Sequence, residues 1–232
     1  MPKRTQLPAS ASFAQTTEDG RLFAPSADRN AQAIAETLTR HAPPTGRALE
    51  IASGTGQHAV HLATTLPGLD WHPSEIDADR LASIDAYRRA AALPNLHPPM
   101  TLDATAPRWA ATSGRFDLIL LVNLLHLISQ AETLVLLSQA RAALSPGGLL
   151  ALYGPFLRSG RATSEGDARF HASLRASDPV IGYKDADDMR GWLTERRLDI
   201  VAVEDMPANN LFFLARAPAL TRPPEEWCQF TA

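Results

Sequence analysis

Arg47-Ala-Leu-Glu-Ile-Ala-Ser-Gly-Thr-Gly-Gln-His-Ala-Val-His-Leu62 is the stretch that decides the fold of this 232-residue chain. An apolar run carrying the carboxylate of Glu50 breaks at Gly54-x-Gly56 and resumes with the spacing of a helix. The pattern predicts a buried strand, a tight turn and a helix N-terminus. Glycines there remove Cβ atoms where the backbone turns and a ligand comes close. The amides that open the helix favour an acceptor, whereas the neighbouring acid favours a ligand with a positive charge.

Strand-like and helix-like patterns alternate on both sides of this stretch. The strands expected from them are 47–52, 69–74, 96–102, 116–123, 149–154, 198–205 and 211–216. Five helices are expected. The first is capped by Ser26 or Asp28 and runs to about Arg40, and the fourth is opened by the capping box Ser129-Gln-Ala-Glu132 and ends near Leu144. The others are 57–66, 78–92 and Asp185–Arg197. Pro98-Pro99 predict an edge strand, because proline cannot donate to a ladder. The most apolar run, Phe116 to Asn123, should be central, and the last two strands should pair antiparallel.

Such repeated strand–helix units predict an α/β fold, a Rossmann-like three-layer αβα sandwich around a mostly parallel sheet. We expect a single domain over 26–217, an N-terminal arm over 1–25 and a C-terminal tail over 218–232. Segment 155–183 is rich in Arg, Ser and Gly and reads as an irregular, substrate-side insertion. Ligands of such sheets bind at the carboxyl ends of the strands, so polar residues just after each strand are the candidates.

Composition excludes several classes of function. A net charge of −3 provides no broad cationic field for a nucleic acid. No apolar stretch approaches the roughly 18 residues of a membrane span. The single cysteine, Cys228, cannot form an internal disulfide, which fits a reducing cytoplasm. No metal site is expected, since His58-x-x-His61 lacks a third ligand. The oligomeric state stays open.

Acids follow the second and third strands. Glu75, which closes Trp71-His-Pro-Ser-Glu75, can accept both ribose hydroxyls of an adenosine cofactor. Alternatively, Glu75 is only an exposed acid at the start of a helix, where the helix dipole favours a negative charge. Asp103 can accept a hydrogen bond from the exocyclic amine of adenine. Alternatively, its side chain only accepts a hydrogen bond from the backbone of its own turn.

Polar and aromatic residues follow the later strands. In Asn123-Leu-Leu-His126, the histidine is either a substrate contact or general base, or a packed core residue. Tyr153-Gly-Pro-Phe156 either lines a substrate pocket or packs in the core. Asn209-Asn210 are candidates for substrate contact, although asparagine is common in turns for backbone reasons alone.

These motifs, together with Ala27-Asp-Arg-Asn30 and Met206-Pro-Ala-Asn-Asn210, give the chain a resemblance to class I S-adenosylmethionine-dependent methyltransferases. More narrowly, it resembles the methyltransferase-like 26 family, over about Phe23 to Phe213. The resemblance implies seven strands in the order 3-2-1-4-5-7-6, with strand 7 antiparallel. It implies that Glu50 and the Ser53–Gly56 backbone hold the methionine portion of S-adenosylmethionine, Glu75 the ribose and Asp103 the adenine. The sequence departs from the common pattern at Ala52, where glycine is frequent and a methyl group should narrow the turn only slightly.

The candidate residues form three groups. Those expected to bind the cofactor are Asn30, Glu50, Ala52, Ser53, Gly54, Thr55, Gly56, Glu75, Ile76, Asp103, Ala104 and Asn123. His126 and Tyr153 are the catalytic candidates. Phe156, Asn209 and Asn210 are the substrate candidates.

The predicted function is methyl transfer from S-adenosylmethionine to a small molecule, in which the main task of the protein is alignment. One alternative is a non-catalytic S-adenosylmethionine-binding or scaffold protein. A weaker alternative is an NAD(P)-dependent oxidoreductase, because Gly54-x-Gly56-x-x-Ala59 also satisfies the dinucleotide fingerprint. Lys3 and Lys184 are the only lysines, which disfavours the Tyr–Lys pair of such an enzyme.

Overall fold

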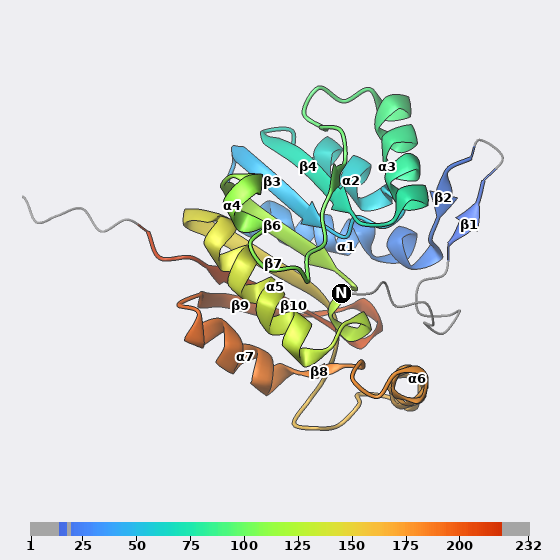
Figure 1. Cartoon of the computed structure of the whole chain (residues 1–232), viewed down its shortest axis with the longest axis vertical. Helices are drawn as coiled ribbons and strands as arrows, with labels where there is room; N and C mark the ends of the chain where they lie inside the picture. Colours follow the sequence, from blue (N-terminus) through green and yellow to red (C-terminus); the bar gives the residue numbers. More distant parts are fainter. Residues whose placement is uncertain (1–13, 18–19, 220–232) are drawn as a thin grey trace, which may run out of the picture.

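The computed structural model describes residues 14–17 and 20–219, which form a sheet covered by helices on both faces (Figure 1). The strands are β3 (Gly46–Ile51), β4 (Leu69–Glu75), β5 (Met100–Thr101), β6 (Phe116–Val122), β7 (Leu144–Leu157), β8 (Lys184–Asp185), β9 (Asp199–Met206) and β10 (Asn210–Arg216). Their order is β5-β4-β3-β6-β7-β10-β9, with β8 paired to β7 outside this path. In this sheet, β10 runs opposite to the other strands and pairs antiparallel with β7 and β9. The predicted order 3-2-1-4-5-7-6 is confirmed, and β8 is an additional short strand.

Helices make the two outer layers. They are α1 (Pro25–His41), α2 (Gln57–Thr65), α3 (Ala78–Ala91), α4 (Ala110–Ser113), α5 (Gln130–Ala143), α6 (Glu165–Ser177) and α7 (Ala186–Glu195), with the 3-10 turns η1 (Leu125–Leu127) and η2 (Pro207–Asn209) and the hairpin β1 (Gln15–Thr16) and β2 (Leu22–Phe23). One face of the sheet packs against α1 and α2, and the other against α5 and α7. The three-layer prediction is therefore confirmed (Figure 1).

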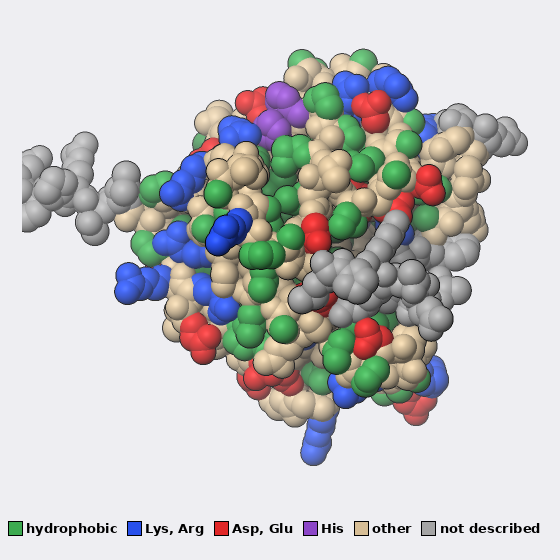
Figure 2. All heavy atoms as spheres, viewed as in Figure 1, with side chains coloured by type: hydrophobic (Ala, Val, Ile, Leu, Met, Phe, Trp, Pro, Cys, Tyr) green, Lys and Arg blue, Asp and Glu red, His purple; other side chains and the backbone are tan. Residues whose placement is uncertain are grey.

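Strand β6 shows why the sheet forms. Leu118 and Leu120 enter the core under α1 and α2, whereas Ile119 and Leu121 enter the core under α5 and α7. A strand covered on both faces has no polar face, which accounts for its continuous apolar run. The surface seen in Figure 2 mixes apolar, acidic and basic side chains, while the largest apolar ones lie inside the layers.

The edge strand β5 is shorter than predicted. It consists of Met100 and Thr101, paired with the end of β4, and Leu96 contributes only an isolated bridge. The prediction of an edge position is confirmed, and that of a strand over 96–102 is wrong in length. Pro98 and Pro99 interrupt the pairing because they cannot donate to it.

The segment 155–183 is more regular than predicted. Strand β7 continues to Leu157, and α6 follows, with the Ser164 side chain accepting from the amide of Asp167 at 3.1 Å. The prediction of an irregular segment is therefore wrong. Leu174 is the buried residue of α6, so the helix has too weak an apolar stripe to be predicted from its spacing.

The two predicted starts of helices had different outcomes. The capping box of Ser129 and Glu132 at α5 is confirmed. The predicted caps of α1 are wrong: the N-cap is Ala24, because Pro25 has a preset φ that opens the helix. Cys228 and most of the predicted arm and tail lie outside the described residues, and within these no helix has the length and apolar character needed to cross a bilayer.

Candidate functional site

The turn between β3 and α2 has a left-handed backbone at three residues. The φ angles are +53° at Ala52, +60° at Gly54 and +97° at Gly56. A Cβ atom on Gly56 would lie 2.9 Å from the Cα atom of Ile84, so α3 also requires glycine there. Ala52 adopts its φ with a side chain in place, which costs about 1 kcal/mol. The methyl group at this position therefore strains the backbone of the turn.

Replacing Gly56 with alanine is expected to lower the free energy of unfolding by about 2 kcal/mol or more, because the φ and the contact with Ile84 both oppose a side chain. The matched control is Ala52→Gly, which relieves strain and should change stability by less than about 1 kcal/mol. Urea unfolding followed by circular dichroism measures both. Equal midpoints for Gly56→Ala and the wild type would contradict this account of the turn.

Glu50 is a buried acid directly before this turn. It is 2% exposed, and its Oε2 atom accepts a hydrogen bond from the indole of Trp71 at 3.0 Å. Within the described part of the chain, no basic side chain forms an ion pair with it. Burial raises the pKa of Glu50 to about 7, outweighing the hydrogen bonds from Trp71 and Ser53, and the charge of Glu75 raises it further. A buried acid without a cationic partner is costly, so the site is suited to a positive ligand.

Ser53 ties the turn to β4. Its amide donates to the carbonyl of Ser74 at 2.8 Å, and its hydroxyl accepts from the amide of Ser74 at 3.1 Å. The Ser74 hydroxyl in turn donates to the carbonyl of Glu50 at 2.8 Å. The Thr55 hydroxyl donates to Gln57 at 2.9 Å. These hydrogen bonds hold the turn in place between β4 and the start of α2.

Glu75 lies at the end of β4, beside the same turn. It is 6% exposed, and its Oε2 atom accepts from the amide of Gly54 at 3.1 Å. Its Oε1 atom accepts from the amide of Ile76 at 2.8 Å. The structure thus brings Glu50, the glycine turn and Glu75 together. The next residue, Ile76, is a large apolar side chain that is 49% exposed.

Asp103 combines a structural role with a free oxygen atom. Its Oδ1 atom accepts from the amide of Thr105 at 2.9 Å and from its hydroxyl at 2.6 Å, as the simpler interpretation of this residue predicts. Its Oδ2 atom has no hydrogen-bond partner among the described residues. Ala104 is buried, and its carbonyl accepts from the indole of Trp109 at 3.2 Å.

The end of β6 lies beside Tyr153 of β7. Asn123 has a φ of +56°, and its amide donates to the carbonyl of Tyr153 at 2.9 Å. A Cβ atom on Gly154 would lie 3.6 Å from the side-chain oxygen of Asn123. Asparagine adopts this left-handed conformation more readily than most residues, so the strand can end here with little strain.

His126 lies under α6, within a group of rings. It is 5% exposed, and its ring packs edge-on against Phe170 at 5.7 Å and Tyr183 at 6.1 Å. Burial, followed by the charge of Lys184, lowers the pKa of His126 to about 3. The ring is therefore neutral and a weak base at physiological pH. These surroundings favour the packed histidine, and its catalytic role stays a prediction.

Tyr153 is part of a polar network that the sequence did not reveal. Its hydroxyl accepts from Asn210 Nδ2 at 3.0 Å. Burial raises the pKa of Tyr153, and the side chains of Asn30 and Asn210 act in the opposite direction. Asn30 Oδ1 lies 2.7 Å from His58 Nε2. From the sequence, His58 was considered only as a metal ligand, and that role was rejected. Its place in the first turn of the helix after the glycines was the available signal.

The remaining substrate candidates lie apart. Phe156 is 2% exposed and packs against Phe213, with ring centroids 4.9 Å apart, so core packing explains it. Asn209 donates to Asp167 Oδ2 at 3.0 Å and so connects the β9–β10 turn to α6. Their contact with a substrate stays a prediction.

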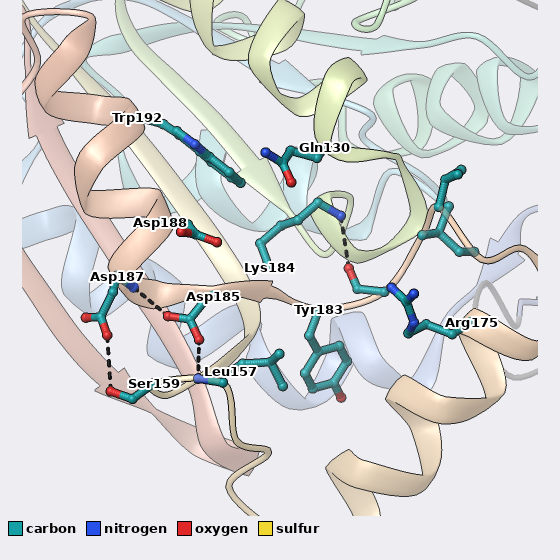
Figure 3. A pocket seen from close by; sticks show the side chains of 14 residues that line it. Gln130, Leu157, Ser159, Arg175, Tyr183, Lys184, Asp185, Asp187, Asp188 and Trp192 are labelled. Carbon is teal, nitrogen blue, oxygen red and sulfur yellow. Dashed lines mark hydrogen bonds between the residues drawn. The ribbon is translucent and has the colours of Figure 1, made fainter.

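A cavity of about 540 Å³ lies between α6, α7 and the segment after β7 (Figure 3). None of the predicted site residues lines it. Asp185 accepts from the amides of Gly160 at 2.5 Å and Asp187 at 2.8 Å, and Asp187 accepts from the Ser159 hydroxyl at 3.1 Å. These two acids are therefore engaged in fastening the loop to α7.

The family model described as "Protein of unknown function (DUF938)" matches residues 21–216. An O-methyltransferase family protein from Burkholderia thailandensis superposes with a TM-score of 0.70 at 13% identity, over 82% of this chain and 57% of that one. An O-methyltransferase family 2 protein from Planctomyces limnophilus in complex with apigenin superposes with a TM-score of 0.65 at 16% identity, over 80% of this chain and 61% of that one. Human N-acetylserotonin methyltransferase in complex with SAM superposes with a TM-score of 0.64 at 14% identity, over 82% of this chain and 55% of that one.

The chain therefore spans little more than half the length of these solved structures, 55–61%. At this low identity, the likeness concerns the fold. The chain has the α/β fold of class I methyltransferases.

Proposed function

The chain belongs to the family described as "Protein of unknown function (DUF938)", and on that premise we propose that it is an S-adenosylmethionine-dependent methyltransferase acting on a small-molecule acceptor. The proposal includes the narrower relationship to the methyltransferase-like 26 family and a cytoplasmic location. The shared fold supports methyl transfer in general, and the site supports the cofactor.

Glu50 is the observation that carries the proposal. A buried carboxylate with a raised pKa and no cationic partner among the described side chains is stabilised by a cation. S-adenosylmethionine carries an ammonium group and a sulfonium group. The pyrophosphate of NAD(P) is negatively charged, so an ionised Glu50 beside the glycine turn would repel it. The charge of the site thus favours S-adenosylmethionine over the dinucleotide alternative.

The other contacts follow from the strand ends. Glu50 and the Ser53–Gly56 backbone would hold the methionine portion, and Glu75 the ribose hydroxyls. Ile76, Asp103 and Ala104 would surround the adenine, with Asp103 Oδ2 as the acceptor for its amine. Asn30 and Asn123 would border the methionine end. Each assignment uses a group that the structure leaves near the carboxyl edge of the sheet.

When bound, S-adenosylmethionine would supply an electrophilic methyl group. The chain's own task is to align the acceptor, which is worth about 7 kcal/mol or more in such reactions. Tyr153 and His126 are the candidates for contact with the acceptor, and their surroundings differ. The Tyr153 hydroxyl lies in a polar network near the glycine turn, whereas the His126 ring lies among aromatic side chains.

Replacing Glu75 with alanine is expected to weaken S-adenosylmethionine binding about tenfold or more, because two ribose hydroxyls lose their acceptor. Titration calorimetry measures the affinity. Asp79→Ala, at an exposed position in the first turn of α3, is the matched control and should bind like the wild type. Unchanged affinity in Glu75→Ala would remove the ribose assignment.

The alternatives give different results in the same titrations. Tight binding of NAD without binding of S-adenosylmethionine would favour the oxidoreductase. Binding of S-adenosylmethionine without transfer of a labelled methyl group to any member of a broad small-molecule panel would favour the non-catalytic binder.

A further inference from the structure

A hydrogen-bond bridge through Ser83 of α3 connects the N-terminal segment to the glycine turn between β3 and α2. The Ser83 hydroxyl accepts from the amide of Leu22 at 2.8 Å and donates to the carbonyl of Thr55 at 2.8 Å. A backbone amide can only donate and a carbonyl can only accept, so the direction of both bonds is fixed. Ser83 is 1% exposed and Thr55 is 4% exposed. Without the hydroxyl, the buried carbonyl of Thr55 would lose this donor, which is costly.

A second bridge, through Gln57 of α2, ends on the same residue of the turn. Gln57 Oε1 accepts from the amide of Ala24 at 2.6 Å and from the Thr55 hydroxyl at 2.9 Å. The amide of Ala24 can only donate, so the atom that faces it is the side-chain oxygen of Gln57. Thr55 is therefore held at its carbonyl by one bridge and at its side chain by the other, and both bridges lead to the N-terminal segment.

The glycine turn is a part of the backbone that needs such support. Ala52, Gly54 and Gly56 all have a positive φ, and Thr55 lies between the two glycines. Strained conformations persist where the surrounding contacts determine them, and glycine gives the backbone freedom to leave them. The helix that follows, α2, has no side-chain cap, so the amides of its first turn are available to a ligand. The shape of the turn decides where these amides point.

The N-terminal segment is also fastened to α3 at a place outside the turn. Gln15–Thr16 and Leu22–Phe23 pair as the hairpin of β1 and β2, which lies beside α3 (Figure 1). The guanidinium of Arg21 lies over the ring of Tyr87 in α3, 4.6 Å from the ring centroid. The docking of the hairpin can therefore be weakened while both bridges to Thr55 keep their donors and acceptors.

We propose that the N-terminal hairpin and the glycine turn form one cooperative unit, in which docking of the hairpin holds the turn in the shape that binds S-adenosylmethionine. Ser83 and Gln57 are the positioning residues of this unit and act through Thr55. The inference rests on the proposed function and names how its cofactor site is controlled. Coupling between two sites is reciprocal: if the docked hairpin strengthens cofactor binding, the bound cofactor strengthens the docking by the same factor.

Hydrogen exchange at the amides of Leu22 and Ala24 measures the docking directly, because each amide exchanges when its bridge opens. We expect saturation of the full chain with S-adenosylhomocysteine to slow exchange at both amides about tenfold, as followed by NMR. The control is the amide of Gly147, which donates to the carbonyl of Pro218 at 3.2 Å near the start of β7. It lies at the opposite edge of the sheet, so its exchange should not change.

Ser83→Ala removes the first bridge and adds no bulk. We expect this variant to bind S-adenosylmethionine about tenfold more weakly in titration calorimetry and to exchange faster at Leu22. Arg21→Ala loosens the hairpin without removing either bridge, and its affinity should fall about threefold. Arg89→Ala is the matched control, because Arg89 lies on the exposed side of α3, 3.3 Å from Asp85, and this variant should bind like the wild type.

Gln57 offers a pair of variants that separates its hydrogen bonds from its packing. Gln57→Met keeps the length of the side chain and removes the acceptor, so binding should weaken about tenfold. Gln57→Glu keeps an oxygen that can accept from both Ala24 and Thr55, so it should bind at least as tightly as the wild type. Melting curves by circular dichroism verify that the variants are folded. If Ser83→Ala does not fold, Gln57→Met and Arg21→Ala still decide the question.

The outcomes separate the two proposals. If calorimetry detects no binding of S-adenosylmethionine or S-adenosylhomocysteine to the wild type, the proposed function fails. If the cofactor product binds but exchange at Leu22 and Ala24 stays the same, the hairpin and the turn are not coupled. If Ser83→Ala and Arg21→Ala bind like the wild type, the bridges only stabilise the fold and the inference is wrong. If Gln57→Glu binds as weakly as Gln57→Met, the positioning role of Gln57 is wrong.

Discussion

Replacing Glu50 with glutamine is expected to weaken S-adenosylmethionine binding by about a hundredfold or more and, at the same time, to stabilise the free protein above pH 7. The first effect arises because a buried, hydrogen-bonded charge loses its counter-charge, which costs about 2–5 kcal/mol. Glutamine keeps the shape and an oxygen that can accept from the Trp71 indole. The comparison therefore isolates the charge.

The stabilising effect follows from the direction of the pKa shift. Burial raises the pKa of Glu50 from 4.5 to about 7, so the folded chain prefers the protonated form. A raised acid pKa makes the folded state less stable as the pH rises from about 4.5 to about 7. Above this window, the ionised Glu50 costs about 3 kcal/mol. Glutamine resembles the protonated form, so Glu50→Gln should exceed the wild type in urea unfolding at pH 8 and match it near pH 4.

The same shift predicts how cofactor binding depends on pH. In the wild type, affinity should rise nearly tenfold per pH unit below about pH 7 and level off above it, because the cation binds the ionised form. Calorimetry in buffers of different ionisation enthalpy should show proton release near pH 6. Glu36→Gln, on the exposed face of α1, is the control and should follow the wild type. A wild-type affinity that does not change between pH 5 and 8 would contradict the role of Glu50.

Replacing Lys184 with methionine is expected to lower the free energy of unfolding by about 3 kcal/mol or more. Lys184 is 7% exposed, and its ammonium group donates to the carbonyls of Leu125 at 2.9 Å, Ile128 at 2.7 Å and Gly182 at 2.9 Å. Each buried carbonyl left without its donor costs about 1–3 kcal/mol. Methionine keeps the apolar stem and removes only the donors. Figure 3 shows the side chain of Lys184 with one of these hydrogen bonds drawn from its nitrogen.

Urea unfolding measures the loss, and hydrogen exchange locates it. We expect faster exchange at Gly182, whose amide donates to the carbonyl of His126 at 3.0 Å and so depends on the same segment. Arg169→Met, on the exposed face of α6, is the control and should change stability by less than about 0.5 kcal/mol. A wild-type midpoint in Lys184→Met would show that the three carbonyls do not need this lysine.

Much of the fold could be predicted because local chemistry agrees with the tertiary structure. The glycine turn, the apolar run of β6 and the prolines before β5 each have one good structural solution. Helix α6 was missed because most of its surface is exposed, so its sequence has little of the periodicity that burial imposes. Strand β8 was missed because two residues are too few to form a pattern.

The candidate site was likewise predictable only in part. Glu50 and Glu75 were recognised because each acid directly follows, or lies within, an apolar strand. His58 was missed because its importance lies in a contact with Asn30, 28 positions earlier in the chain. Nothing in the sequence near His126 indicates the rings of Phe170 and Tyr183 that bury it.

The sequence alone therefore determined where most of the strands lie in the chain, the glycine turn and the acids beside it, because apolar spacing, proline and glycine act on the backbone within a few residues. The order of the strands in the sheet came from the family resemblance. Only the tertiary structure decided which polar groups pair across elements and which titratable groups are buried. Hydrogen-bond partners and pKa shifts depend on what surrounds a side chain in space, and in Asn30, His58, Tyr153 and Asn210 these surroundings come from four separate elements.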